Sequence, residues 1–250
     1  MAFRSKTIGA CVALALGLPG LAEEFRIEVR HHSPIKRVAR KTIHGELHID
    51  ESGVRFRQLT KKKKQKPVEW AWKYQDIQQL TVAPRSLTVL SFADSGWKLG
   101  ADRIYRFDQP KEGGFDKVYE FLKTRLDQRL VAALAPAELR AEWEIPAKHR
   151  IGPAGTEGML RFGPDWISYA TKEGEDARTL RYADIDNISS SGPFQLTITT
   201  FERSKANHAS YRDLNFQLKA PLDEKRFEKL WQALNQSRHI HVLQNYRMEK

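Results

Sequence analysis

The sequence predicts a mainly β protein built from two copies of one unit, each with about six or seven short antiparallel strands followed by one helix. Three observations favour this class. Blocks of residues recur in the same order, the earlier blocks alternate apolar and polar residues, and the last block has amphipathic helical spacing. The predicted division is a signal peptide (1–22), two domains (23–136 and 137–236) and a basic tail (237–250).

Composition excludes several other classes. The chain has 250 residues, with 42 Lys and Arg against 31 Asp and Glu, which gives a formal net charge of +11. Six Trp, seven Tyr and twelve Phe are too many aromatic residues for a disordered chain, and one Cys excludes a disulfide scaffold. The long apolar run lies at the N-terminus, so a transmembrane bundle is not expected.

The N-terminus has the layout of a secretory signal peptide. Arg4 and Lys6 precede an apolar stretch over residues 8–21, and Ala22 supplies a small residue before the predicted cut. We therefore expect an exported protein, periplasmic or secreted. Two minor alternatives are an uncleaved N-terminal anchor, for which the stretch is shorter than the roughly 20 residues of a span, and lipidation at Cys11, which precedes the stretch.

The repeat begins with a Gly-x-Leu strand. At an offset of 113, Leu47, Ile49, Val54 and Phe56 correspond to Leu160, Phe162, Ile167 and Tyr169. At an offset of 108, Trp72, Tyr74, Asp76, Ile77 and Leu80 correspond to Leu180, Tyr182, Asp184, Ile185 and Ile188. The difference of five locates an insertion in the first copy, at the lysine run of residues 61–66. A later block pairs Leu87, Thr88, Val89, Tyr105 and Phe107 with Leu196, Thr197, Ile198, Phe216 and Leu218.

The last block of each copy predicts a helix. Its apolar residues recur at i, i+3, i+4 and i+7: Phe115, Val118, Tyr119 and Leu122, then Phe227, Leu230, Trp231 and Leu234. A small bent sheet leaves one mouth open, and we expect this helix to be its main hydrophobic plug. Burial of each large side chain is worth roughly 1.5 to 3 kcal/mol. The Ala-rich segment 130–135 is expected to prolong the first helix until Pro136 ends it, which places the domain boundary there.

This pattern resembles the pleckstrin-homology-like superfold, in particular the bacterial PH and GRAM-type modules. The resembling features are the Gly-x-Leu strand, the aromatic-x-Asp-Ile turn at residues 74–77 and 182–185, and the terminal helix. We expect Asp76 and Asp184 to bond nearby backbone N–H groups while the following Ile enters the core. In eukaryotic relatives of the superfold a basic loop near the open end of the barrel often holds a lipid phosphate.

Histidines also recur, as His31 and His149. Together with His32 and His44, His31 suggests an alternative function, a small metal-dependent or hydrolytic enzyme. Against it, residues 31 and 32 point to opposite faces of a strand, and no acidic pair accompanies either repeated histidine. We expect each to anchor its neighbouring loop by a hydrogen bond. Ser189 to Gly192 reads as a loop, and the sequence supports no catalytic residues, metal or cofactor.

The feature most open to function is a basic cluster with flanking aromatic residues. Its predicted anion-binding residues are Lys61, Lys62, Lys63, Lys64, Lys66, Arg55 and Arg57. Such a loop could bind anionic lipid headgroups or an acidic envelope polymer, or it could merely keep the protein soluble. The second copy lacks the insertion, and residues 172–176 make its equivalent loop acidic on balance, so the copies should differ in what they bind, unless the second is purely structural.

The function expected from the sequence is a non-catalytic, exported binding or scaffolding module. Another alternative is a protein–protein adaptor that binds a partner by a strand edge. Nucleic acid is an unlikely partner, because the tryptophans beside the lysine run share the pattern of core residues and an exported protein seldom meets nucleic acid. The ligand and the oligomeric state are not predicted.

Overall fold

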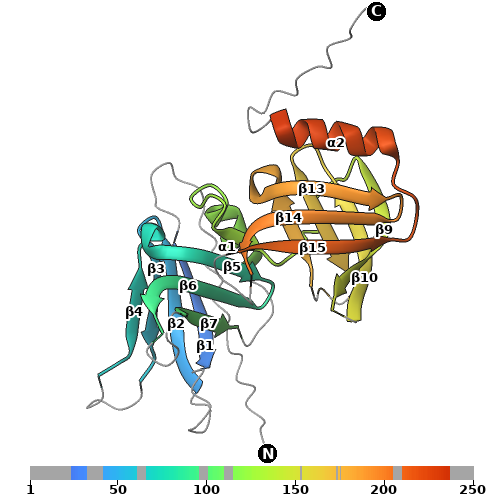
Figure 1. Ribbon diagram of the computed structural model, residues 1–250. Helices are drawn as coiled ribbons and strands as arrows, with labels where there is room; N and C mark the ends of the chain where they lie inside the picture. Colours follow the sequence, from blue (N-terminus) through green and yellow to red (C-terminus); the bar gives the residue numbers. More distant parts are fainter. Residues whose placement is uncertain are drawn as a thin grey trace, which may run out of the picture.

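The protein is mainly β and consists of two units that lie side by side and share one continuous sheet (Figure 1). The computed structural model describes residues 24–32, 42–60, 66–95, 101–109, 115–152, 154–172, 174, 176–204 and 210–236. The predicted signal peptide, Lys61 to Lys64 and the basic tail lie outside the described residues.

Each unit contains seven strands, a short 3-10 turn and one α-helix, in the same order along the chain. The first unit comprises β1 (Phe25–His32), β2 (Thr42–Asp50), β3 (Gly53–Gln58), β4 (Glu69–Trp72), η1 (Tyr74–Asp76), β5 (Ile77–Ala83), β6 (Ser86–Asp94), β7 (Asp102–Asp108) and α1 (Phe115–Leu122). The second comprises β9 (Trp143–Ile151), β10 (Ala154–Phe162), β11 (Trp166–Thr171), β12 (Arg178–Arg181), η2 (Tyr182–Asp184), β13 (Ile185–Gly192), β14 (Gln195–Arg203), β15 (Tyr211–Leu218) and α2 (Glu224–Gln236).

The strand order is also the same in both units. It runs β5-β6-β7-β1-β2-β3-β4 in the first and β13-β14-β15-β9-β10-β11-β12 in the second, and the sheet is open rather than closed into a barrel. The expectation of a mainly β fold, in which a helix follows the strands, is confirmed. Ser189 to Gly192 belong to strand β13, however, so their interpretation as a loop was wrong.

The strand register confirms most of the repeat alignment and corrects one block. Leu47 pairs with Phe56, and the corresponding Leu160 pairs with Tyr169. On the next strands, Leu87 pairs with Phe107 and Leu196 pairs with Phe216. Phe107 therefore corresponds to Phe216, not to Leu218 as the sequence suggested. The error was two residues, which alternation of period two cannot detect.

Two hydrophobic clusters form the cores, one in each unit. Helix α1 buries all four apolar residues of its predicted stripe, together with Phe121, against the first cluster. Helix α2 buries only Leu230 and Leu234, while Phe227 and Trp231 are partly buried against the second cluster. The prediction that the helix is the main plug therefore fits the first unit better than the second.

The junction between the units is a strand, not a helix. Helix α1 ends at Leu122, and the Ala-rich segment forms β8 (Leu130–Ala132). Strand β8 pairs in parallel with β5 and meets β12 where Thr179 lies opposite Ala132, so it links the edges of both units. The helical prediction failed because the helix propensity of alanine is a small effect. The backbone hydrogen bonds that β8 makes with the open edges of two strands outweigh it.

One arginine of the second unit also bonds the turn that follows α1. The Arg181 guanidinium donates hydrogen bonds to the carbonyl oxygens of Lys123 and Asp127, each at 2.8 Å, and to that of Leu126 at 3.3 Å. It also pairs with the carboxylate of Asp184 at 2.6 Å. Arg181 therefore ties the turn that follows α1 to the second unit, because the three carbonyl oxygens lie beyond the last helical residue, Leu122.

Candidate functional site

The outer face of β3 carries the described arginines of the predicted anion-binding cluster. Arg55 and Arg57 point to the same face because successive side chains of a strand alternate. Residues 59–68 connect β3 to its antiparallel neighbour β4, so the lysine run belongs to this hairpin, and Lys66 is exposed. Strand β4 ends the sheet order.

Both arginines are paired with carboxylates. Arg55 forms an ion pair with Asp50, and Nε of Arg57 lies 3.1 Å from Oε1 of Glu69. Burial alone would raise the pKa of Asp50, but hydrogen bonds from Ser52 and Arg55 outweigh it and the pKa is lowered. The carboxyl group of Asp50 is therefore ionised at neutral pH and pairs with the Arg55 guanidinium.

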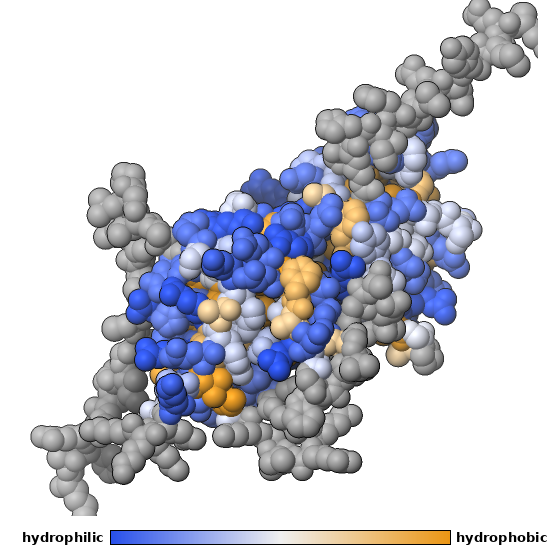
Figure 2. All heavy atoms as spheres, turned by 60° about the vertical axis from the view of Figure 1, so that its left-hand side comes forward, coloured by the Kyte–Doolittle hydropathy of each residue, from blue (hydrophilic) through white to orange (hydrophobic). Residues whose placement is uncertain are grey.

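These side chains line a shallow hollow of about 440 Å³ on the outer face of the first unit. Its lining residues are Glu24, Arg26, His48, Arg55, Phe56, Arg57, Glu69, Trp70 and Ala71. Figure 2 shows the side on which the first unit lies, where hydrophilic residues cover most of the surface not hidden by grey atoms and apolar ones form small separate areas. The lining side chains of the hollow therefore carry both signs of charge, from glutamates and from arginines.

The predicted histidine cluster does not assemble. His31 is buried in the core of the first unit, whereas His32 and His44 are exposed on the opposite face of the sheet. His32 lies across the strand pair from Thr42, and His44 lies opposite Arg30. Within the described residues, no group of three or more His, Cys, Asp or Glu could hold a metal ion.

His31 is a core residue with a backbone partner. Its Nδ1 lies 3.0 Å from the carbonyl oxygen of Arg106 on β7, and aromatic rings surround it, with Trp70 edge-on at 4.9 Å and Phe107 at 5.5 Å. Burial lowers the pKa of His31. The imidazole is therefore neutral at pH 7 and donates from Nδ1. Its partner is a strand carbonyl, not the neighbouring loop that we expected.

His149 occupies the same place in the second unit but bonds a side chain. Its Nδ1 is hydrogen-bonded to the carboxylate of Asp176, a residue with a left-handed backbone (φ 60°) in the connection between β11 and β12. His149 thus bonds a loop, as expected, but this loop is the connection between β11 and β12 and does not neighbour His149 in the sequence. The sequence analysis missed the partner because 27 residues separate Asp176 from His149.

The expectation for the turn aspartates is confirmed at one position. Oδ2 of Asp184 accepts a hydrogen bond of 3.0 Å from the backbone N–H of Arg181, and Ile77 and Ile185 are fully buried. Among the described residues, the carboxylate of Asp76 makes no such bond.

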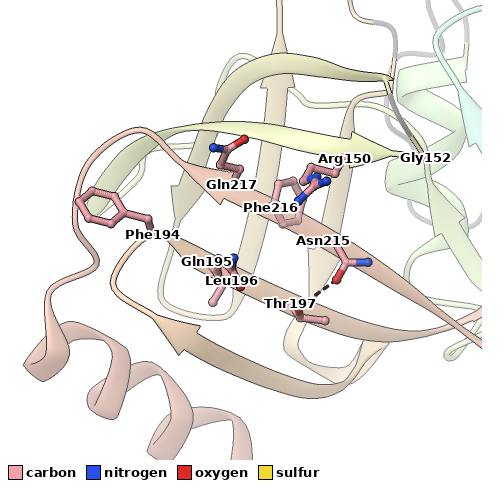
Figure 3. Close-up of a pocket in the computed structure, with 9 residues that line it drawn as sticks. All are labelled: Arg150, Gly152, Phe194, Gln195, Leu196, Thr197, Asn215, Phe216 and Gln217. Carbon is pink, nitrogen blue, oxygen red and sulfur yellow. Dashed lines mark hydrogen bonds between the residues drawn. The ribbon is translucent and has the colours of Figure 1, made fainter.

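A second hollow, of about 370 Å³, lies on the outer face of the second unit (Figure 3). Its lining residues are Arg150, Gly152, Phe194, Gln195, Leu196, Thr197, Asn215, Phe216 and Gln217. Oγ1 of Thr197 donates to Oδ1 of Asn215 at 3.0 Å. The amide and hydroxyl side chains come from β14 and β15, and half of the Phe194 surface is exposed at one end.

Sequence reasoning missed this second surface. Its residues carry no charge run and no motif, and polar residues at alternate strand positions are ordinary for a sheet face in water. The available signal was composition: five outward positions of β14 and β15 (195, 197, 199, 215 and 217) are amides or hydroxyls, in a chain of which 29% is charged.

Comparisons with known proteins do not assign a family. No family model matches the chain, and no curated protein matches it. The structural neighbours include the C-terminal domain of an unknown protein from Leishmania infantum, with 14% identity, a TM-score of 0.29 and coverage of 38% of this chain and 84% of that one. They also include the Spt16D Pob3N heterodimer, with 9% identity, a TM-score of 0.31 and coverage of 80% and 98%. Neither described helix is long and apolar enough to span a membrane.

Proposed function

We propose that the protein is an exported, non-catalytic module of two PH-like domains that adsorbs through the β3–β4 hairpin to a surface bearing phosphate groups, with anionic lipid headgroups as the first candidate. The observation that carries this proposal is the placement of Arg55 and Arg57 on the outer face of the hairpin that contains the lysine run. An acidic envelope polymer would offer the same phosphate chemistry.

The ion pairs of the two arginines do not prevent such binding. More than half of each arginine side chain is exposed, and exposed ion pairs are worth roughly 0 to 1 kcal/mol, so phosphate groups can compete with their carboxylates. Each lysine gains about 1 kcal/mol near an anionic lipid surface, within a screening length of roughly 10 Å. The expected binding is therefore additive in lysines and sensitive to salt.

The test is sedimentation of residues 23–250 with anionic and with neutral liposomes, at low and at high salt. The test variant changes Lys61, Lys62, Lys63 and Lys64 to Gln. The control variant removes the same charge from exposed sites elsewhere, by changing Lys117, Lys172, Lys225 and Lys229 to Gln.

We expect binding that requires anionic lipid, falls with salt and is lost only in the test variant. Soluble polyphosphate distinguishes lipid headgroups from an acidic polymer as the source of phosphate. A module that binds a polymer will bind polyphosphate as tightly as it binds vesicles. Equal sedimentation of the two variants would show that total charge, not the hairpin, drives adsorption. If the protein bound neither probe, the proposal would be wrong and the lysines would serve only to keep the protein soluble.

The strand-edge adaptor is the second candidate, and the sheet order favours it over the enzyme. Within the described chain, β4 and β13 are the two end strands of the sheet, and each has one edge without a partner strand. Unpaired edges are templates for strand addition by a partner. The histidines of the enzyme alternative do not converge.

A further inference from the structure

The outer face of β14 and β15 carries a row of uncharged hydrogen-bonding side chains, which we call the amide–hydroxyl ladder. Its members are Gln195, Thr197, Thr199, Asn215 and Gln217. They pair across the two strands: Gln195 lies opposite Gln217, and Thr197 lies opposite Asn215. Among the outward positions 195–201 and 211–217, Asp213 is the single side chain charged at neutral pH, and it accepts a hydrogen bond of 2.7 Å from Thr199.

Aromatic side chains bound the ladder at both ends. Phe194 is half exposed beside Gln195, at the rim of the hollow in Figure 3. At the other end Tyr211 is 47% exposed, and its ring meets that of Phe201 edge-on at 5.2 Å. The seven residue steps from Phe194 to Phe201 span about 23 Å at the rise of a strand.

The ladder is not a requirement of the fold, because the first unit lacks it at the same positions. There the strand register places Thr88 opposite Arg106 and Ser86 opposite Asp108, and Nε of Arg106 lies 2.8 Å from Oδ1 of Asp108. The corresponding pairs in the second unit are Thr197 with Asn215 and Gln195 with Gln217. The same strand pairing therefore carries an ion pair in the first unit and neutral amides in the second.

From this geometry we propose that the outer face of β14 and β15 binds a neutral, linear glycan. Sugar hydroxyl groups both donate and accept hydrogen bonds, as do amide and hydroxyl side chains. Among the described residues, the amide of Gln217 has no hydrogen-bond partner, so it is available to a ligand. The apolar face of a sugar ring packs on an exposed aromatic ring such as Phe194, and an elongated face suits a chain of sugars.

The small number of charges favours this ligand over the alternatives. A phosphate-bearing ligand would call for several cations, and among the residues that line the hollow Arg150 is the one cation, with Lys148 opposite Gln217 on the neighbouring strand β9. A peptide that adds a strand would use the backbone of the β13 edge, not side chains in the middle of the sheet. The proposal is also independent of the lysine run.

The experiment is calorimetric titration of the purified protein with three neutral hexasaccharides, chitohexaose, cellohexaose and maltohexaose, up to millimolar concentration. The test variants are Phe194→Ala and Asn215→Ala. The matched control is Phe92→Ala, which removes an aromatic ring that is 60% exposed on the first unit. Circular dichroism verifies that each variant is folded.

We expect at least one hexasaccharide to bind, with an affinity that does not depend on salt. Phe194→Ala should weaken it about tenfold and Phe92→Ala should not change it. Binding of none of the three chains would overturn the proposal, as would equal affinity in all variants. A dimer in sedimentation velocity that Phe194→Ala dissociates would assign the face to a second copy of this chain instead.

Discussion

Two glycines at matching positions, Gly45 and Gly158, explain the Gly-x-Leu signature of each copy. A Cβ at Gly45 would meet the ring of Phe56 on the neighbouring strand, and a Cβ at Gly158 would meet the ring of Tyr169 and the carbonyl oxygen of Ala170. The missing side chain therefore lets a large aromatic residue cross above the strand. Packing alone therefore explains why glycine stands at these two positions.

Gly45→Ala should lower the free energy of unfolding by about 1 to 3 kcal/mol, because the buried Phe56 ring must leave its position. Urea denaturation followed by tryptophan fluorescence measures the change. A loss of less than about 0.5 kcal/mol, the usual effect of a surface substitution, would show that the ring moves without cost.

His31 makes stability depend on pH. Its pKa in the folded protein is lowered by burial, so the unfolded chain takes up a proton, as pH falls through about 6.5, before the folded chain does. The free energy of unfolding should therefore decrease from pH 7.5 to pH 5.5. His31→Phe should flatten this slope. Equal slopes in the two proteins would contradict the buried, neutral His31.

The bond between His149 and Asp176 should stabilise the second unit. Asp176→Ala leaves Nδ1 of a buried histidine without a partner, and alanine tolerates the positive φ of this position less well than aspartate does, so we expect a loss of about 2 to 3 kcal/mol. Asp176→Asn keeps an acceptor and tolerates the left-handed backbone, so most of the stability should remain. Equal losses in thermal unfolding would assign the effect to charge rather than to the hydrogen bond.

At the scale of elements, the turn that follows helix α1 depends on the second unit. Arg181→Ala removes three hydrogen bonds to carbonyl groups of this turn and leaves the carboxylate of Asp184 buried without its cation. We expect a loss of about 2 to 4 kcal/mol in the free energy of unfolding, only partly restored by Arg181→Lys, which cannot reproduce the fork of donors. Full restoration by lysine would show that charge alone matters.

The sequence predicted the strands and helices well because one buried face imposes a period on each element. It failed where the cause is long-range. Strand β8 depends on two edges, contributed by β5 and β12, that the Ala-rich segment does not reveal. Asp176 and Arg181 bond groups far away in the chain. The amide–hydroxyl ladder escaped because amides on a strand have no distinctive spacing.

At the scale of the whole molecule, two units with one strand order differ on their outer faces. The first carries the arginines of β3 beside the lysine run, and the second carries the amide–hydroxyl ladder on β14 and β15. Strand β8 and Arg181 connect the two units, so both faces belong to one continuous hydrogen-bonded sheet. We propose a polyanion as the ligand of the first face and a neutral glycan as the ligand of the second.

The most direct test of this division is one binding series in which the protein with Lys61 to Lys64 changed to Gln and the Phe194→Ala protein each meet anionic liposomes and the hexasaccharides. We expect the lysine variant to lose binding to liposomes and keep binding to the glycan, and the Phe194→Ala protein to do the reverse. If either variant lost binding to both ligands, or if both variants kept both ligands, this division of function between the two faces would be contradicted.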